Sequence, residues 1–186
     1  MRSLIILFLI FCFITTSIRA QQQYEFTRLD NKDGLSGNQI GHIFKDSRGF
    51  LWICTNIGLD RYDGVNVKKY KHIKNDPNSP QQDWMFNIQE DINGNLWIQS
   101  YTYILYDWKN ERFINDTDSV LVAMGLPPAP TVMEIDKDKN LFFAYPDQGI
   151  YKYDSKSKNI TIFCQSKNNN DLDLSDITQI KVQGQF

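Results

Sequence analysis

The sequence lacks the features that mark several large classes of protein. Its 20 Lys and Arg residues and 22 Asp and Glu residues leave a net charge of −2, and no run of basic residues stands out. Proteins that bind nucleic acids usually carry an excess of basic residues, with which they hold the phosphates. This charge balance therefore argues against a nucleic-acid-binding protein. With two histidines and three cysteines, the chain shows no Ser/His/Asp set, metal-ligand cluster or phosphate-binding loop. We therefore expect no catalytic, cofactor-binding or metal-binding residue, and no enzyme activity within this chain.

After residue 20 the sequence also lacks helical periodicity and any apolar run long enough to span a membrane. Apolar residues make up 41% of the chain and aromatic residues 13%, which is the composition of a folded protein rather than a disordered one. We therefore expect a globular all-β domain.

The first twenty residues form a separate segment. Arg2 precedes an unbroken apolar run, Leu4–Ile14, and the more polar Thr15–Ala20 ends in a small residue. This order is typical of a secretory signal peptide, which we predict over residues 1–20, with cleavage after Ala20. The alternative is an uncleaved membrane anchor, which needs about 20 apolar residues, more than this run supplies.

A motif that occurs three times is the clearest positive feature. Asp46–Ile53 (DSRGFLWI) recurs as Asp91–Ile98 (DINGNLWI) and, in weaker form, as Asp136–Phe143 (DKDKNLFF), each 45 residues after the last. A fixed period of this length is the signature of a repeat architecture. The function of such a chain comes from a stack of similar units rather than from one catalytic cluster.

Each repeat contains four short β-type runs separated by turn residues. Asp46–Gly49 begins with Asp and ends with Gly, which suits a type I turn, and Asp63-Gly64 is a strong hairpin signal. The predicted strands are Ile40–Lys45, Phe50–Thr55, Leu59–Tyr62 and Val67–Tyr70, then Met85–Glu90, Leu96–Ser100, Tyr103–Tyr106 and Arg112–Ile114, then Thr131–Ile135, Leu141–Ala144, Ile150–Tyr153 and Ile160–Phe163.

Four antiparallel strands in a repeat of this length predict the blade of a β-propeller. We place the repeats at about residues 35–79, 80–126 and 127–173, with the start of a fourth at 174–186. Residues 24–29 predict an outer strand with no partner in its own repeat. A β-sandwich is the alternative all-β fold, but it does not require one motif at a fixed offset.

The number of repeats is too small for a closed ring, which takes about 4–8 blades. Residues 21–186 supply about three and a half blades, so we expect an incomplete propeller. We also expect the chain to be the front part of a longer protein.

Aromatic residues divide into two groups by their place in the repeat. Trp52, Trp97 and Phe142 hold the same position of the motif, which predicts that they pack between blades. Aromatic residues outside this pattern are better candidates for ligand binding, and these are Trp84, Tyr101, Tyr103 and Trp108.

Other residues with potential chemistry have simpler structural interpretations. Asp91–Asn95 and Asp136–Asn140 resemble the start of a calcium-binding loop, but the distant Glu of such a loop is missing, and a turn between strands explains both segments. We expect His42 in a strand and His72 in a loop to be ordinary structural or surface residues.

Two cysteines follow the predicted signal peptide, Cys54 and Cys164. Export makes a disulfide between them possible. They lie in different repeats, which need not touch. We therefore favour two separate small buried side chains over a disulfide.

Leu35-Ser36, Ile43–Ile53 and Gly58–Gly64 together resemble the two-component regulator propeller repeat. The third repeat departs from that pattern, because Lys139 replaces Gly and Phe142-Phe143 replaces Trp-Ile. We expect the turn there to be weaker.

The resemblance implies the periplasmic sensor region of a hybrid two-component regulator of Gram-negative bacteria. Such a propeller would sense an extracellular nutrient, commonly an oligosaccharide, and drive a cytoplasmic phosphorelay. The parent protein would be a histidine kinase, anchored in the inner membrane as a homodimer. In this segment we expect no nucleic-acid partner and no membrane span after the signal peptide.

Two other functions stay open from the sequence. The first is a freestanding secreted propeller that binds carbohydrate or protein. The second is a propeller enzyme such as a lyase or glycosidase, which would need acid and base residues converging on the centre of the ring.

Overall fold

The computed structural model describes residues 28–146, 148–163 and 180. These residues form three antiparallel sheets of four strands each, and within each sheet the strands lie in sequence order. The first sheet contains β1 (Ile40–Lys45), β2 (Leu51–Thr55), β3 (Gly58–Tyr62) and β4 (Val67–Tyr70); the second contains β5 (Asn87–Glu90), β6 (Leu96–Gln99), β7 (Tyr103–Asp107) and β8 (Arg112–Ile114); the third contains β9 (Val132–Ile135), β10 (Leu141–Tyr145), β11 (Gly149–Tyr153) and β12 (Ile160–Phe163).

These are the twelve strands that the sequence predicts within the described residues, with ends that differ by at most two residues. The four-stranded meander repeated three times is the blade topology of a propeller. The fold is therefore all-β, as expected, and built of propeller blades.

The expectation of a chain without helices is wrong at one segment. Helix α2 (Thr117–Ala123) lies between the second and third sheets in the sequence, and a short 3₁₀ helix, η1 (Asn31–Asp33), precedes β1. The Asp116 carboxylate caps α2 by accepting the Ser119 backbone N–H at 3.1 Å. Leu121 anchors the helix with a side chain that is 0% exposed.

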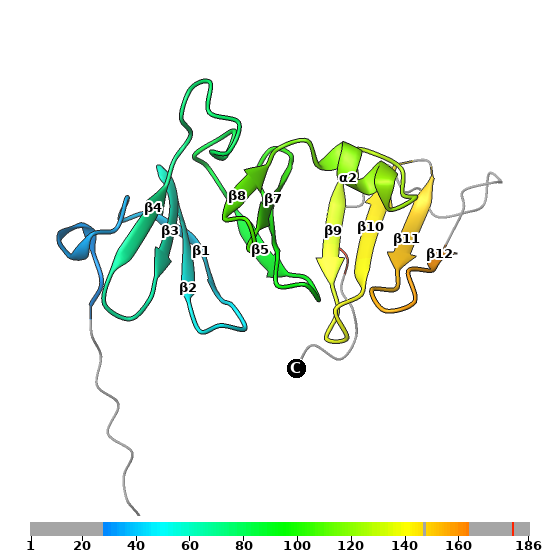
Figure 1. Cartoon of the computed structure of the whole chain (residues 1–186), viewed down its shortest axis with the longest axis horizontal. Coiled ribbons are helices and arrows are strands. Elements are labelled where there is room, and N and C mark those ends of the chain that lie inside the picture. Colours follow the sequence, from blue (N-terminus) through cyan, green and yellow to red (C-terminus); the bar gives the residue numbers. More distant parts are fainter. Residues whose placement is uncertain (1–27, 147, 164–179, 181–186) are drawn as a thin grey trace, which may run out of the picture.

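The three sheets follow one another along the long axis of the molecule (Figure 1). Their first strands face each other, because β1 contacts β5 and β5 contacts β9. The first strand of each blade is thus the inner strand, and β4, β8 and β12 are the outer ones. Among the described residues the sheets form an open arc rather than a closed ring.

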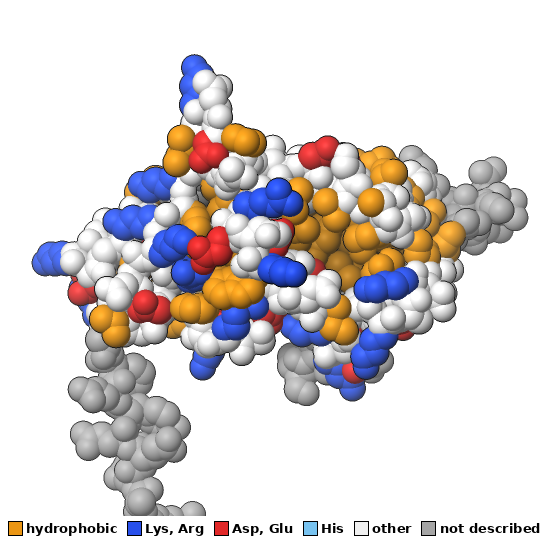
Figure 2. All heavy atoms as spheres, viewed as in Figure 1, with side chains coloured by type: hydrophobic (Ala, Val, Ile, Leu, Met, Phe, Trp, Pro, Cys, Tyr) orange, Lys and Arg blue, Asp and Glu red, His pale blue; other side chains and the backbone are white. Residues whose placement is uncertain are grey.

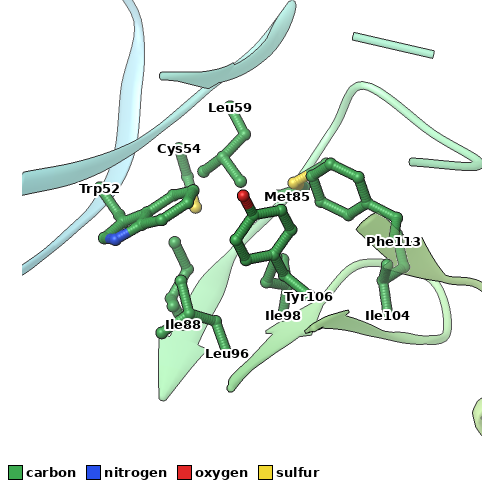
Figure 3. Packing of buried hydrophobic residues seen from close by; sticks show 10 residues of the cluster. All are labelled: Trp52, Cys54, Leu59, Met85, Ile88, Leu96, Ile98, Ile104, Tyr106 and Phe113. Carbon is green, nitrogen blue, oxygen red and sulfur yellow. The ribbon is translucent and has the colours of Figure 1, made fainter. Parts of the chain in front are cut away.

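The first hydrophobic core joins the first and second sheets (Figure 3). Trp52 is 0% exposed, and its ring lies 5.2 Å from the ring of Tyr106 across the interface. Each fully buried apolar side chain of this kind contributes about 1.5–3 kcal/mol to folding. The cluster consists of Trp52, Cys54, Leu59, Met85, Ile88, Leu96, Ile98, Ile104, Tyr106 and Phe113.

The second core joins the second and third sheets and includes α2. Trp97 packs there with its ring 6.0 Å from the ring of Phe143. The predicted core role is therefore confirmed for Trp52 and Trp97. Phe142 is half-buried and pairs with Glu134 and Lys152, so it lies on the face of its sheet opposite to Phe143.

The turn of the first repeat is built around Asp46. Its Oδ1 accepts the backbone N–H groups of Arg48 and Phe50, both at 3.0 Å, and its Oδ2 accepts the indole N–H of Trp52 at 2.9 Å. One carboxylate therefore fixes the turn and the orientation of the core tryptophan. The turn interpretation of Asp91 and Asp136 holds as well, because each accepts a backbone N–H of its own turn.

The turn of the third repeat shows how the missing Gly is replaced. Lys139 adopts a left-handed backbone with φ of 67°, where the first two repeats have Gly49 at 95° and Gly94 at 79°. A non-glycine residue in this region costs about 1–2 kcal/mol. The Lys139 ammonium donates to the Glu90 backbone carbonyl at 2.9 Å, which offsets part of that cost.

Several predicted features lie outside the described residues. These are the signal peptide, most of the strand at residues 24–29, the start of the fourth repeat and Cys164. Cys54 is a buried free thiol, as predicted. No helix in the described part of the chain is long and apolar enough to cross a membrane.

Candidate functional site

The four predicted ligand-binding aromatics fall in three different environments. Trp84 and Tyr101 are 52% and 70% exposed. Tyr103 begins β7 and is half-buried, while Trp108 packs against the first hydrophobic core. The structure thus brings Trp84, Tyr101 and Tyr103 to one region and leaves Trp108 elsewhere.

That region contains a cleft of about 450 Å³ where the second sheet meets the approach to the third, which we call the inter-sheet cleft. One wall is the β6–β7 turn with its flanks, residues 99–103. The segment that leads into α2, residues 115–118, and the segment that leads into β9, residues 129–131, form the others, with Gln81 beside them. Its floor and walls therefore come from connections at one end of the blades.

An exposed aromatic cluster borders this cleft. The ring of Trp84 lies 5.4 Å from that of Phe86, and the ring of Tyr101 lies 6.3 Å from Trp84 and 6.1 Å from Phe86. We call these three residues the aromatic patch. Tyr101 belongs to both the patch and the cleft. Exposed aromatic faces beside polar groups suit ligands with one apolar and one polar face.

The walls of the cleft are held by hydrogen bonds between segments. The Thr117 hydroxyl donates to the Tyr103 carbonyl at 3.0 Å, which joins the start of α2 to β7. The Ala129 N–H donates to Asp118 Oδ1 at 2.7 Å, which joins the same helix to the segment before β9. Gln81 Nε2 donates to Thr102 Oγ1 at 2.6 Å. These contacts preorganise the cleft, which reduces the entropy cost of binding.

Tyr103 places a phenol in the cleft wall. Its hydroxyl is buried and makes no hydrogen bond of good geometry within the described residues. Burial raises the pKa of this hydroxyl to about 12, although the nearby Met133 backbone lowers the pKa to a smaller extent. The hydroxyl is therefore protonated at neutral pH, and it is closed off from solvent rather than presented to the cleft.

Trp108 is committed to packing instead. The guanidinium carbon of Arg48 lies 3.8 Å from its ring centroid, and the ring of Phe50 lies 5.5 Å away. A cation over the indole face occupies the surface that a ligand would need. This arrangement joins the turn of the first repeat to the second sheet.

The two histidines occupy the elements expected for them. His42 lies in β1 and lines an open groove of about 290 Å³ along the inner strands, together with Glu90 and Glu134. Burial lowers the pKa of His42, against a smaller opposing effect of the Ile88 backbone. His72 lies in the loop after β4, where its Nδ1 is 3.1 Å from the Pro80 carbonyl oxygen. Among residues 28–146, 148–163 and 180, no group of three or more His, Cys, Asp or Glu side chains could hold a metal ion.

Sequence reasoning missed the polar half of the cleft. Asp116 and Asp118 line it because α2 begins there, and the sequence analysis predicts no helix at this point. The available signal was a capping residue, Asp116, before a short segment that ends at Gly125. Gln81 reaches the cleft from a loop whose course depends on the tertiary fold.

Comparison with known proteins identifies the repeat. The family model "Two component regulator propeller" matches residues 34–56. This confirms the resemblance carried by Leu35-Ser36 and the strand-turn-strand motif that follows.

A curated relative is similar over part of the chain. The protein named histidine kinase P4 from Formosa agariphila is 33% identical over 72 residues, which are 38% of this chain and 5% of that protein. The chain therefore spans a small part of the length of this relative.

Solved structures with a similar course of the chain come from B. thetaiotaomicron. The extracellular domain of one hybrid two-component system is 18% identical with a TM-score of 0.47, over 82% of this chain and 20% of that one. The extracellular domain of another is 18% identical with a TM-score of 0.35, over 76% of this chain and 27% of that one.

Proposed function

Because the chain carries the two-component regulator propeller repeat at residues 34–56, we propose that it is the ligand-sensing propeller segment of a hybrid two-component regulator. The ligand is a small extracellular molecule, of which an oligosaccharide fits best. Binding is passed as a conformational change to a histidine kinase in the same parent protein. That parent is anchored in the inner membrane and acts as a dimer.

The single observation that carries the binding role is the inter-sheet cleft beside the aromatic patch. Tyr101 is 70% exposed at its mouth, and hydroxyls and amides line its interior. A sugar ring has an apolar C–H face that stacks on an aromatic ring and an edge of hydroxyls that bond to such polar groups. The cleft provides both kinds of contact in one place.

The position of the cleft supports a sensing role. Its walls include residues of the second sheet and the segments that lead into α2 and β9. A ligand held there contacts two blades at once and favours the arrangement of the sheets that fits it best. A ligand can transmit a signal only if it binds one arrangement of the sheets more tightly than the other.

A periplasmic location is part of the proposal. Arg2 and the apolar run that follows it form the pattern of an export signal. The relatives of known structure are described as extracellular domains, and this is the location proposed for the present chain. Fusing residues 1–20 to alkaline phosphatase, which is active only after export, tests the signal; an inactive fusion would contradict it.

Ligand binding can be tested by titration calorimetry of the full chain against a panel of oligosaccharides. We expect at least one to bind, and Tyr101→Ala to weaken its binding about tenfold because one stacking face is lost. Trp84→Ala is expected to act in the same direction.

Val65→Ala is the matched control. Val65 is an exposed apolar side chain, 82% accessible, in the turn between β3 and β4. It is outside the cleft lining, so its truncation should leave affinity unchanged. Equal effects of Tyr101→Ala and Val65→Ala would argue against the cleft, and the absence of binding by every oligosaccharide would argue against the proposed ligand class.

A further inference from the structure

The inter-sheet cleft carries charge of one sign. Asp116 and Asp118 are among the residues that line it, and the part of the lining that the structure describes includes no Lys, Arg or His. The other polar groups of the lining are hydroxyls and amides. Figure 2 shows acidic and uncharged side chains, and no Lys or Arg, over α2 at the upper edge of the view.

Both carboxylates are fixed by hydrogen bonds that leave their charge in place. Asp116 accepts the hydroxyl of Ser119 at 2.6 Å and its backbone N–H at 3.1 Å, and these two bonds lower the pKa of Asp116. Asp118 accepts the Ala129 N–H, and its negative charge helps to raise the pKa of Tyr145, for which burial is the larger cause. Asp116 is therefore ionised at neutral pH.

Neither carboxylate is neutralised by an ion pair among the described residues. The ion pairs of this part of the chain involve Asp30, Asp46, Glu90, Asp107 and Glu111 instead. The cleft therefore presents two negative charges to whatever enters it.

We infer that the inter-sheet cleft favours uncharged or amino-bearing saccharides over those that carry carboxylate or sulfate groups. This inference rests on the proposed function, since it defines the charge of the ligand for the same site. In a water-like medium, a like charge brought close to either carboxylate lowers the affinity roughly fivefold for each contact. An amino group at the same place gains a similar factor.

The experiment compares saccharides that share one backbone. The full chain is titrated in a calorimeter with β-1,4-linked tetramers of glucose, glucosamine and glucuronate, and then with a wider panel of neutral, amino and acidic oligosaccharides. We expect the acidic member of each matched set to bind about tenfold more weakly than the neutral one. In the double variant Asp116→Asn and Asp118→Asn, the ratio of the affinity for the neutral saccharide to that for the acidic one should fall about fivefold or more.

The substitution to Asn keeps the structural roles of both residues. Asn is as good a helix cap as Asp, and its carbonyl oxygen can still accept the N–H of Ser119 or Ala129. The matched control is Asp63→Asn with Asp154→Asn, which removes two negative charges from exposed turns of other hairpins. This control should leave the discrimination between neutral and acidic sugars unchanged.

The outcomes separate the inference from the proposed function. Acidic tetramers that bind as tightly as neutral ones would overturn the inference and leave a saccharide-binding sensor intact. Binding by no saccharide would count against the proposed function. The charge of the cleft is then measured with cationic and anionic nitroxide probes by NMR: the Thr102 amide should be broadened more by the cation, and equal broadening would overturn the inference.

Discussion

Ser47 and Glu90 join the first two blades through a hydrogen bond of 2.7 Å between the Ser47 hydroxyl and Glu90 Oε1. The Ser47 backbone N–H donates to the same carboxylate at 3.1 Å, and Arg48 lies 3.4 Å from it. From the third blade, the Lys139 ammonium lies 3.5 Å from Glu90 Oε2. A single carboxylate, with a side chain only 4% exposed, therefore contacts the turns of both neighbouring blades.

Glu90→Ala is expected to lower the free energy of unfolding by about 2–4 kcal/mol. The substitution leaves the Ser47 N–H and part of the Arg48 guanidinium without their acceptor, and buried groups of this kind cost about 1–3 kcal/mol each. Urea unfolding followed by tryptophan fluorescence measures the change. Glu90→Gln, which keeps one acceptor oxygen, should lose about half as much.

Glu111→Ala is the control for this interaction. Glu111 bridges Arg61 and Lys68, but its side chain is 51% exposed. Exposed ion pairs are worth about 0–1 kcal/mol. If Glu90→Ala and Glu111→Ala lower the free energy of unfolding equally, the contacts of the Glu90 carboxylate with the neighbouring blades do not stabilise the fold.

Lys139 tests whether backbone strain is offset by a side-chain contact. Lys139→Ala keeps the left-handed φ of 67° but removes the ammonium that bonds to Glu90. Lys139→Gly removes the ammonium and also the strain. We therefore expect the Gly variant to be more stable than the Ala variant by about 1 kcal/mol, measured as the difference in urea midpoint at equal slope. An Ala variant that equals or exceeds the Gly variant would show that the turn is not strained.

The repeats themselves could be predicted because they are local patterns. The turn of Asp46–Gly49, the alternating apolar residues and the recurring aromatic at Trp52 and Trp97 each report on a few neighbouring residues. The strand positions follow from these signals. The short helix was missed because Thr117–Ala123 is too brief for a periodic pattern and depends on its cap and on burial of Leu121.

The interfaces and the cleft could not be predicted in the same way. The position of Glu90 in the second repeat is occupied by Lys45 in the first repeat and by Ile135 in the third. Of these three residues, Glu90 alone has a carboxylate. Its role depends on two turns that are distant in the sequence. Similarly, Tyr101 and Asp118 share a cleft only because α2 folds back toward the β6–β7 turn. Trp108 was predicted with them from the same aromatic signal, but it packs under Arg48.

The Asp46 carboxylate is expected to couple energetically to the Trp52 indole. In Asp46→Asn, an amide N–H would face the indole N–H that now lies 2.9 Å from Oδ2. Leaving a buried donor without an acceptor costs about 1–3 kcal/mol. In Asp46→Asn combined with Trp52→Phe the conflict is absent, so the double variant should lose less than the sum of the single variants.

The double-mutant cycle by urea unfolding gives this coupling directly. Asp63→Asn is the control, because Asp63 also caps a turn through Oδ1 but has no indole partner in the part of the chain that the structure describes. A coupling energy near zero for Asp46 and Trp52 would mean that the indole bond adds nothing to the turn bonds. The second repeat has a weaker form of this contact. The indole N–H of Trp97 makes no hydrogen bond of good geometry among the described residues, although its interaction with Asp91 opposes part of the rise that burial causes in the pKa of that carboxyl.

The Cys54 thiol is expected to stay protonated far into the alkaline range. Burial raises its pKa from an ordinary value of 9.0 to about 12. Because the folded state holds a proton that the unfolded state releases, the stability that it contributes is complete below about pH 9. That contribution is lost as pH rises from about 9 toward 12, at about 1.4 kcal/mol per pH unit.

The 13Cβ chemical shift of 13C-labelled cysteine measures this titration in a variant with Cys12→Ser and Cys164→Ser, so that one thiol remains and tyrosine ionisation does not interfere. In the folded protein the shift should move only above about pH 11, or with alkaline unfolding if that comes first. In 8 M urea it should move near pH 9, which serves as the internal control. Half-titration of the folded protein between pH 8 and 9 would show that Cys54 is open to water, and that the packing between Trp52 and Tyr106 around it is looser than described.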